Sequence, residues 1–352
     1  MMTLPMSFLS RFLKPTSTGI SITDTHIRFA TFSKTKTVPR LVNFGSIPLD
    51  PGVIVRGEIM DAEKFITAME HAGDSGKIRR ANIGISDRLA YSFTVSHVKN
   101  GNDWDKAIRD KISDVLLNHH RDDLDDSMVE YEITEETPEI IRAFVWAIPR
   151  QSIDGYQEIC RLAGVRVQSV QTNMYHVASR CAQGTAPGTC MFVDVGLDRS
   201  HIAVAHNGQV KSLATVPIGG SSIQPMIDEY LKLHPEKSVE FESSIGMSPV
   251  VHDQVFLEKM SRAIAPLAEH VTRERVKWDE GPEPSIDRIH LMGEHAHHPG
   301  LQVYLSRLTD TPAKHLDIWG NEYRYNNIPE ISFDQSLKYA SAIALAMQGV
   351  EE

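Results

Sequence analysis

The stretch MFVDVGLDRS, residues 191–200, decides the fold of this chain. Its apolar run ends in a turn that contains Asp194 and Gly196, and an apolar run resumes at residues 201–205. Apolar runs of strand length on both sides of a polar turn predict a β-hairpin. An Asp at the end of the first strand, followed by Gly, also makes this hairpin a candidate phosphate-binding turn.

A second copy of the hairpin lies near the N-terminus, at residues 19–27 (GISITDTHI). It has the same strand–turn–strand rhythm, but Ser21 and Thr23 stand where the other copy has Asp and Gly. Strands and helices alternate, and the strand–hairpin–helix order occurs twice, beginning near Gly19 and Cys190. Such a duplication predicts an α/β architecture of two related halves with a cleft between them.

Length and composition are those of a globular protein with two domains. The chain has 352 residues, of which 41% are hydrophobic and 23% charged, and its formal net charge is −10. That charge argues against a nucleic-acid partner, and no apolar run approaches the ~20 residues of a transmembrane helix. No secretory signal is evident, and three widely spaced cysteines are typical of reduced thiols in a cytosolic protein.

Four parts are expected along the chain. The first is a tail with an amphipathic stretch at Met6–Lys14, which would either bind a membrane surface or partner, or stay a tail or docked helix. A tail or a docked helix is favoured, because isolated helices shorter than ~12 residues are marginally stable in water. The parts are this tail at 1–17, a first lobe at 18–183 with an inserted subdomain at about 92–149, a second lobe at 184–330 with a small subdomain at about 221–260, and a C-terminal helix at 331–352 packing back on the first lobe.

Three local patterns predict further elements. The run Pro51–Ile59 is bounded by Pro and Gly and is interpreted as a connection. The periodicity of Gln254–Val276 predicts a long helix, and Pro266 predicts an interruption of it. Small and apolar residues from Phe333 to Met347 predict a single closing helix.

The glycine turns suggest how a nucleotide would bind. Asp194 could hold Mg²⁺ through water, and Gly196 would let backbone N–H groups reach phosphate oxygens, with a hydrogen bond from Ser200. Gly219 and Gly220 lead into a predicted helix whose N-terminus favours an anion. A buried strand also runs into a turn at Gly293. A lone Asp-x-Gly is common in ordinary turns, so the combination carries this prediction.

With these turns in place, the layout resembles the actin-like ATPase family and, within it, the PilM branch of type IV pilus assembly proteins, which are relatives of FtsA. The stretch Leu41–Ile59 is similar to a distinctive run in that branch, and the resemblance covers Gly19 to Met347. Supporting matches are Leu162–Val165, Asp194–Gly196 and Pro217–Gly220.

The resemblance implies an actin-like (ribonuclease H-type duplicated) fold, with two lobes around a central nucleotide cleft and an inserted subdomain of the FtsA/PilM type. It implies ATP and Mg²⁺ as cofactors, with Asp194 as the residue that would hold the metal ion. The resemblance identifies no catalytic residue in this sequence. The expected cofactor-binding residues are Thr23, Asp24, Asp194, Gly196, Ser200, Gly219, Gly220 and Gly293.

The sequence departs from the family pattern at two turns. The first hairpin of the family usually reads Asp-Ile-Gly, whereas here it is Ser21-Ile22-Thr23, and Asp24 is shifted along the turn. Glu294 stands where a second glycine is usual. Because actin-like hydrolysis depends on positioned groups, these departures predict a pseudo-ATPase or a very weak ATPase. His295, His297 and His298, which follow Glu294, do not have the spacing of a common zinc site.

The resemblance also implies a function and partners. The expected protein is a cytoplasmic scaffold, peripheral at the inner membrane, that binds the N-terminal peptide of a PilN-like bitopic protein and contacts other platform and motor components. Self-association is a further expectation. Two alternatives stay open at this point: an active, polymerising FtsA-like ATPase, and a component of a type II secretion platform.

Overall fold

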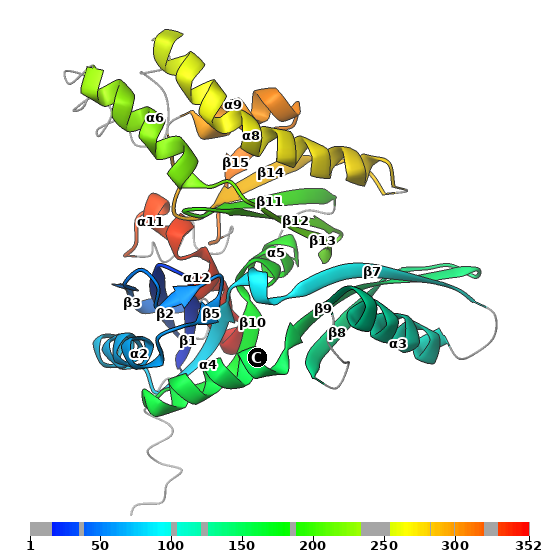
Figure 1. Ribbon diagram of the computed structural model, residues 1–352, viewed down its shortest axis with the longest axis horizontal. Helices are drawn as coiled ribbons and strands as arrows, with labels where there is room; N and C mark the ends of the chain where they lie inside the picture. The colour runs from blue at the N-terminus through cyan, green and yellow to red at the C-terminus, as the bar shows by residue number, and fades with distance from the viewer. Residues whose placement is uncertain are drawn as a thin grey trace, which may run out of the picture. The chain divides into compact units, whose positions relative to one another are not determined.

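The computed structural model describes residues 16–34, 39–99, 104–120, 126–183, 188–233, 254–281, 283–298, 300–319 and 330–351. The amphipathic stretch at Met6–Lys14 therefore lies outside the described residues, as does most of the second half of the small subdomain expected at 221–260. The chain divides into two compact units (Figure 1). The first unit comprises Met1–Val177, Ile318–Ser332 and Tyr339–Glu352, and the second comprises Ala178–Asp317 and Phe333–Lys338.

The first unit is built on a five-stranded sheet in which β1 and β2 form the N-terminal hairpin. In the order across the sheet, its strands are β10 (Arg166–Thr172), β6 (Arg80–Ile85), β1 (Thr16–Ile22), β2 (His26–Ser33) and β3 (Arg40–Pro48). The β10–β6 and β6–β1 pairs are parallel, and the other two are antiparallel. Its helices are α2 (Ala62–Gly76), α4 (Arg150–Leu162) and α12 (Ala340–Glu351), with a 3₁₀ turn at Asp87–Leu89.

The second unit repeats this sheet. In the order that corresponds to the first sheet, its strands are β15 (Ala313–His315), β14 (Arg288–Met292), β11 (Thr189–Val195), β12 (Ser200–His206) and β13 (Gln209–Val216). The β11–β14 and β14–β15 pairs are parallel and the other two antiparallel, so strand order and direction match those of the first unit. This is the duplicated α/β fold that the two hairpins predicted. The helices are α6 (Gly220–Leu233), α8 (Gln254–Asp279), α9 (Leu301–Thr309) and α11 (Phe333–Lys338), and α5 (Asn173–Gln183) runs from the first unit into the second.

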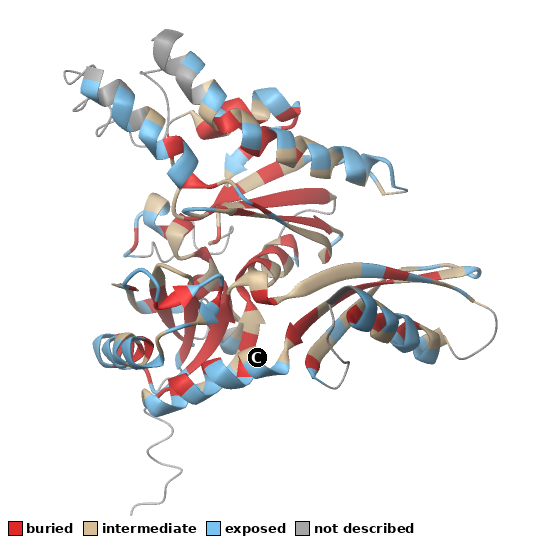
Figure 2. Ribbon diagram, in the orientation of Figure 1, coloured by how far each residue is buried: buried red, intermediate tan, exposed pale blue. Residues whose placement is uncertain are grey.

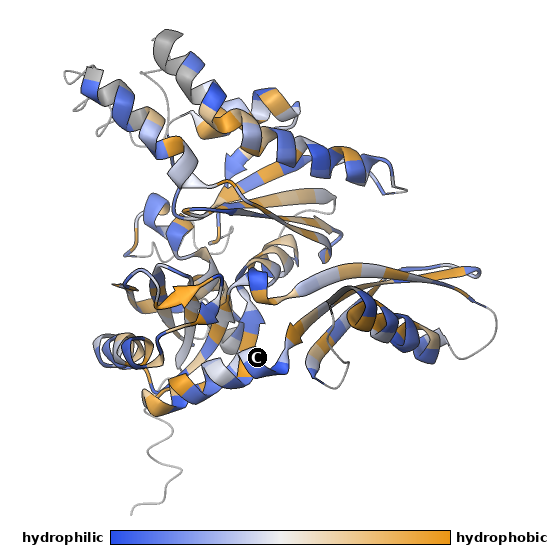
Figure 3. Ribbon diagram, in the orientation of Figure 1, coloured by the Kyte–Doolittle hydropathy of each residue, from blue (hydrophilic) through white to orange (hydrophobic). Residues whose placement is uncertain are grey.

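An insertion in the first unit forms a small layer of its own. Its sheet has the order β7 (Tyr91–Val98), β9 (Ile140–Pro149), β8 (Ser127–Glu136), and all pairs are antiparallel. Helix α3 (Trp104–Val115), followed by a π-helical turn at Leu116–His120, covers one face of this sheet (Figure 1). Hydrophobic and hydrophilic residues lie on different sides of α3 (Figure 3), as expected for a helix that buries one face.

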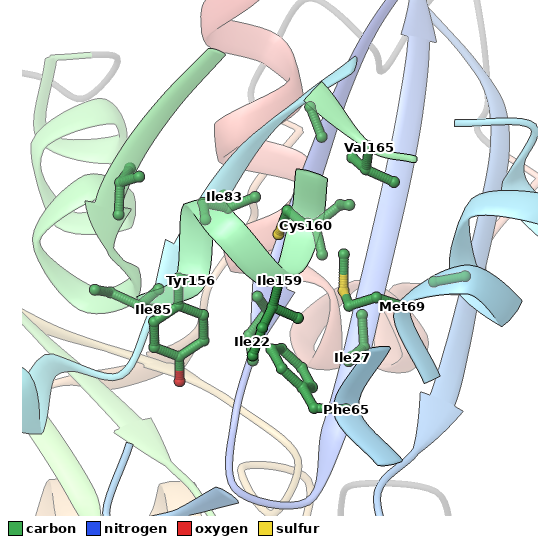
Figure 4. Packing of buried hydrophobic residues seen from close by; sticks show 14 of the residues in the cluster. Ile22, Ile27, Phe65, Met69, Ile83, Ile85, Tyr156, Ile159, Cys160 and Val165 are labelled. Carbon is green, nitrogen blue, oxygen red and sulfur yellow. The ribbon is translucent and has the colours of Figure 1, made fainter. Parts of the chain in front are cut away.

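Strands β1, β2 and β6 of the first sheet and β11 and β12 of the second are mostly buried (Figure 2), which explains their apolar residues. In the first unit, α2 and α4 pack side chains against the sheet in one cluster that includes Phe65, Met69 and Tyr156 (Figure 4). Phe65 and Tyr156 meet edge to face, with ring centroids 5.8 Å apart. No helix among the described residues is both long and apolar enough to span a membrane.

The structure corrects three predicted elements. The run Pro51–Ile59 contains a short hairpin, β4 (Ile54–Val55) and β5 (Glu58–Ile59). Helix α8 continues through Pro266, because the buried neighbours Ile264, Leu267 and Val271 offset the lost backbone hydrogen bond. The predicted closing helix is two helices, and the chain passes from the second unit to the first at Tyr339, between α11 and α12.

Candidate functional site

The turn of the first hairpin is closed by a side chain. Thr23 Oγ1 donates to the His26 carbonyl and accepts the His26 N–H, both at 3.1 Å, while the Thr23 N–H donates to the same carbonyl at 2.9 Å. A β-branched residue with a hydroxyl thus takes the position that Gly196 has in the second hairpin. The Thr23 hydroxyl satisfies the backbone of its own turn.

Asp24, the other candidate in this turn, binds backbone groups of the β4–β5 hairpin. Its carboxylate accepts the N–H of Arg56 at 2.8 Å and that of Gly57 at 2.9 Å. The hydroxyl of Tyr156 donates to the Gly57 carbonyl at 2.7 Å. Burial, and then the nearby Asp24 charge, raises the pKa of Tyr156, so the phenol stays protonated as a donor. Both carboxylate oxygens of Asp24 therefore hold protein backbone.

In the second unit, Asp194 lies against Gly293. Asp194 is the penultimate residue of β11 and pairs with Met292 on the parallel strand β14, so the turn after β14 begins beside it. Gly293 has φ +101°, and a methyl group there would overlap Oδ1 of Asp194. Only glycine allows this approach. The structure therefore brings together the carboxylate predicted to hold the metal ion and the predicted nucleotide-binding turn at Gly293.

The turn after β11 is held by its own backbone and by α6. The Gly196 N–H donates to the Arg199 carbonyl at 3.0 Å, and the fully buried Ser200 donates its hydroxyl to the Ile218 carbonyl at 2.7 Å. The first N–H groups of α6 donate to this turn: Gly220 to the Gly196 carbonyl at 2.9 Å, and Ser221 to the Leu197 carbonyl at 2.7 Å. These donors, which at a helix N-terminus favour an anion, are engaged within the protein.

The glycines before α6 are both buried by protein atoms. A methyl group on Gly219 would overlap the carbonyl oxygen of Leu197, and one on Gly220 would overlap the imidazole ring of His295. Six of the eight predicted cofactor residues thus belong to the second unit and lie in its connected turns. Their glycines admit close packing of the protein on itself, whereas Thr23 and Asp24 belong to the first unit.

The histidines after Gly293 form a stacked group. The rings of His295 and His298 have centroids 5.0 Å apart at 28°, and their Nδ1 and Nε2 atoms are 3.1 Å apart. Burial, followed by the charges of His295 and His297, lowers the pKa of His298 to about 3. Across the described ranges, no three His, Cys, Asp or Glu side chains converge as metal ligands.

Sequence reasoning did not single out one further feature, the face of the inserted sheet opposite α3. Trp146 on β9 stacks on Tyr175 of α5, with ring centroids 4.2 Å apart at 34°, and Phe144 lies 6.0 Å from Trp146. Glu130 and Glu132 of β8 lie opposite Trp146 and Phe144 in register. The alternation of these aromatics with Ala and Val along β9 is a signal that could have pointed to a two-sided strand.

This chain resembles a known protein family and several solved structures. The family model described as type IV pilus assembly protein PilM matches residues 19–350. A PilM–PilN type IV pilus biogenesis complex matches with a TM-score of 0.72 at 13% identity, covering 97% of this chain and 100% of the matched chain. The ethanolamine utilization protein EutJ from Carboxydothermus hydrogenoformans matches with a TM-score of 0.55 at 12% identity, covering 96% and 90%. No curated protein sequence matches. The structural likeness confirms the predicted actin-like fold.

Proposed function

Because this chain belongs to the family of the type IV pilus assembly protein PilM, we propose that it is a scaffold of a type IV pilus platform. It works at the cytoplasmic face of the inner membrane, where it binds the cytoplasmic N-terminal peptide of a PilN-like bitopic protein. Through that peptide it links the platform to its motor components. The family match over residues 19–350 favours a pilus over a type II secretion system.

The observation that supports peptide binding is the aromatic and acidic face of the inserted sheet. Helix α3 packs on one face through Ile108 and Ile112, which share a core with Ala143 and Val145 of β9. Alternation along a strand sends Phe144 and Trp146 to the other face, where Phe144 is buried and Trp146 is half-buried. Stacked aromatic rings are typical anchors of protein interfaces. A solved chain from a PilM–PilN complex has the same fold, which supports a PilN-like protein as the partner.

The carboxylates of β8 define the chemistry of the expected peptide. Burial, followed by the charges of Glu132 and Glu130, raises the pKa of Tyr175, so both carboxylates lie near this ring. Rings beside carboxylates favour a peptide with apolar side chains and at least one Lys or Arg, which gains both cation–π and ionic contacts. We therefore place the peptide on Trp146 and Tyr175, with its basic side chain toward Glu130.

Weak or absent ATP hydrolysis is part of the proposal. Phosphoryl transfer needs groups positioned for phosphate, metal and water. In the first hairpin, Ser21 replaces a carboxylate, the Thr23 hydroxyl closes its own turn and Asp24 holds the β4–β5 hairpin. Loss of one such group costs ~10²–10³ in rate. An active, polymerising ATPase would need other residues to position the phosphate, the metal ion and the water.

Isothermal titration with a synthetic peptide tests the peptide-binding part. The peptide carries the cytoplasmic N-terminal sequence of the PilN-like protein of the same organism. We expect Trp146→Ala to weaken binding at least about tenfold, because a stacked aromatic anchor is lost. Trp278→Ala, which removes a half-buried Trp from the second unit, is the matched control and should bind like wild type. Unchanged affinity in Trp146→Ala, with circular dichroism like wild type, would place the peptide elsewhere.

A further inference from the structure

The imidazole of His295 lies directly on Gly220. A methyl group on Gly220 would overlap Cγ, Nδ1 and Cδ2 of that ring, so the ring covers the position from which a ligand would approach this glycine. The N–H of His295 donates to the Val195 carbonyl at 3.0 Å, which fixes the residue between the two glycine turns. The backbone of His295 is thus bonded to the end of β11, next to the turn at Gly196 that was predicted to bind phosphate.

A second imidazole supports the first. His298 is 6% exposed and stacks on His295, and the contact between Nδ1 of one and Nε2 of the other is 3.1 Å. Such a hydrogen bond needs one protonated and one unprotonated nitrogen, as two neutral rings provide. Burial and the two neighbouring histidines keep the pKa of His298 far below neutrality, to about 3. At cellular pH its ring therefore stays in the uncharged form that the stack requires.

The neighbouring glycines also pack against protein atoms. Gly219 packs on the carbonyl of Leu197, and Gly293 packs on the Asp194 carboxylate. The N–H groups of Gly220 and Ser221 donate to the turn. Gly219, Gly220 and Gly293 therefore do not fit ATP, because their surfaces, and the N–H groups of Gly220 and Ser221, are occupied by protein atoms.

We propose that the stacked imidazoles of His295 and His298 are a built-in stopper, which occupies the surface of Gly220 and keeps a nucleoside triphosphate off the second unit. This inference rests on the proposed function and deepens it. It attributes the lack of nucleotide binding to the His295 side chain as well as to the altered turn of the first hairpin. The scaffold is then independent of the nucleotide supply of the cell.

Titration with a fluorescent ATP analogue, MANT-ATP, in the presence of Mg²⁺ tests the stopper in the full chain. Wild type and His295→Phe, which keeps a ring in place, should show no saturable binding. His295→Gly should gain affinity by at least about tenfold over both. Saturable binding to wild type that His295→Gly does not improve would overturn the proposal, as would a folded His295→Gly protein without any gain.

A measurement on wild type covers the case in which His295→Gly does not fold. Exchange of the imidazole C2 proton with deuterium, followed by mass spectrometry, should be at least about tenfold slower at His295 than at the exposed His71, and ATP should not change it. Equal rates, or slowing of His295 by ATP, would overturn the stopper. Peptide binding is measured separately, so a protein that binds both peptide and ATP keeps the proposed function and loses only this inference.

Discussion

The carboxylate of Asp24 holds the backbone of Gly57. Its Oδ1 accepts the Gly57 N–H at 2.9 Å, and its Oδ2 accepts the Arg56 N–H at 2.8 Å. Both residues have positive φ, +58° at Arg56 and +80° at Gly57, so this turn is a conformation that needs support. A carboxylate in the turn of the first hairpin thus stabilises the β4–β5 hairpin.

Removal of this carboxylate should destabilise the first unit. We expect Asp24→Ala to lower the free energy of unfolding by about 2 kcal/mol, because two charge-assisted hydrogen bonds to backbone are lost. Urea denaturation followed by circular dichroism measures the change. Asp154→Ala, at an exposed site on α4, is the control and should stay within about 0.5 kcal/mol of wild type. Equal midpoints for both variants would contradict the role of Asp24.

Tyr156 supports the same turn from the core. Tyr156→Phe keeps the ring that meets Phe65 and removes only the hydroxyl bonded to the Gly57 carbonyl. We expect a loss of about 1 kcal/mol in the free energy of unfolding, measured in urea. In a double-mutant cycle with Asp24→Ala, the two losses should not add, because both side chains bind the backbone of Gly57. Additive losses would show that the two contacts act independently.

Phosphate release should not depend on Asp194. With Mg²⁺ and ATP, a malachite-green assay should give the same rate near background for wild type and Asp194→Ala, because positioned groups for hydrolysis are missing in both. The peptide titration on the same preparations shows that the protein is functional. Turnover in wild type that Asp194→Ala abolishes would instead support an active ATPase.

Replacement of the partly buried His290 by an apolar ring should stabilise the second unit. The His290 ring stacks on Phe192 with centroids 5.2 Å apart, and neither ring nitrogen has a hydrogen-bond partner among the described residues. Replacement by Phe keeps the stacking and removes a buried N–H that lacks a partner. We expect His290→Phe to gain about 1 kcal/mol at pH 7 in urea denaturation. A loss of stability would contradict this account of the ring.

The same variant should change the pH dependence of stability. Burial, followed by the charges of Arg288 and Lys314, lowers the pKa of His290 from 6.5 to about 4. The folded state therefore favours the neutral ring, and its contribution is complete above pH 6.5 and is lost as the pH falls toward 4. Urea midpoints of wild type should fall more steeply over this interval than those of His290→Phe. Parallel curves would contradict the shift.

Close packing of the C-terminal helix on β1 gives a further test. A methyl group on Gly19 would overlap the Ala342 carbonyl oxygen of α12 and lie 2.6 Å from the Ala346 nitrogen. Gly19→Ala should therefore lower the free energy of unfolding by about 1–3 kcal/mol. Gly155→Ala is the matched control, because a methyl group there meets no atom within 4 Å and Ala favours the helix α4. A neutral Gly19→Ala would mean that α12 can shift away from β1.

Local pattern was enough to find the fold. The alternation around Asp194 and its copy near Thr23 predicted two hairpins, and each is the β1–β2 or β11–β12 pair of a five-stranded sheet with the same strand order. The resemblance of the chain to the PilM branch was confirmed by the family match over residues 19–350. Such features are readable because strand periodicity and turn residues are short-range properties of the chain.

Other local signals were overridden by packing. Pro266 stays inside α8 because apolar side chains on both sides of it are buried. The closing helix breaks at Tyr339, whose ring meets Phe44 edge to face at 5.5 Å. In both cases, contacts with residues distant in sequence outweigh a propensity of about a few kcal/mol or less.

Asp, Gly and Ser at fixed spacing mark the candidate nucleotide-binding turns without any structure. The groups that these residues contact depend on the fold. Asp24 holds backbone 32 residues away, and the ring of His295 covers Gly220. The reason is physical: a carboxylate or a glycine surface serves whichever partner the fold brings to it, and here the fold brings protein backbone and an imidazole.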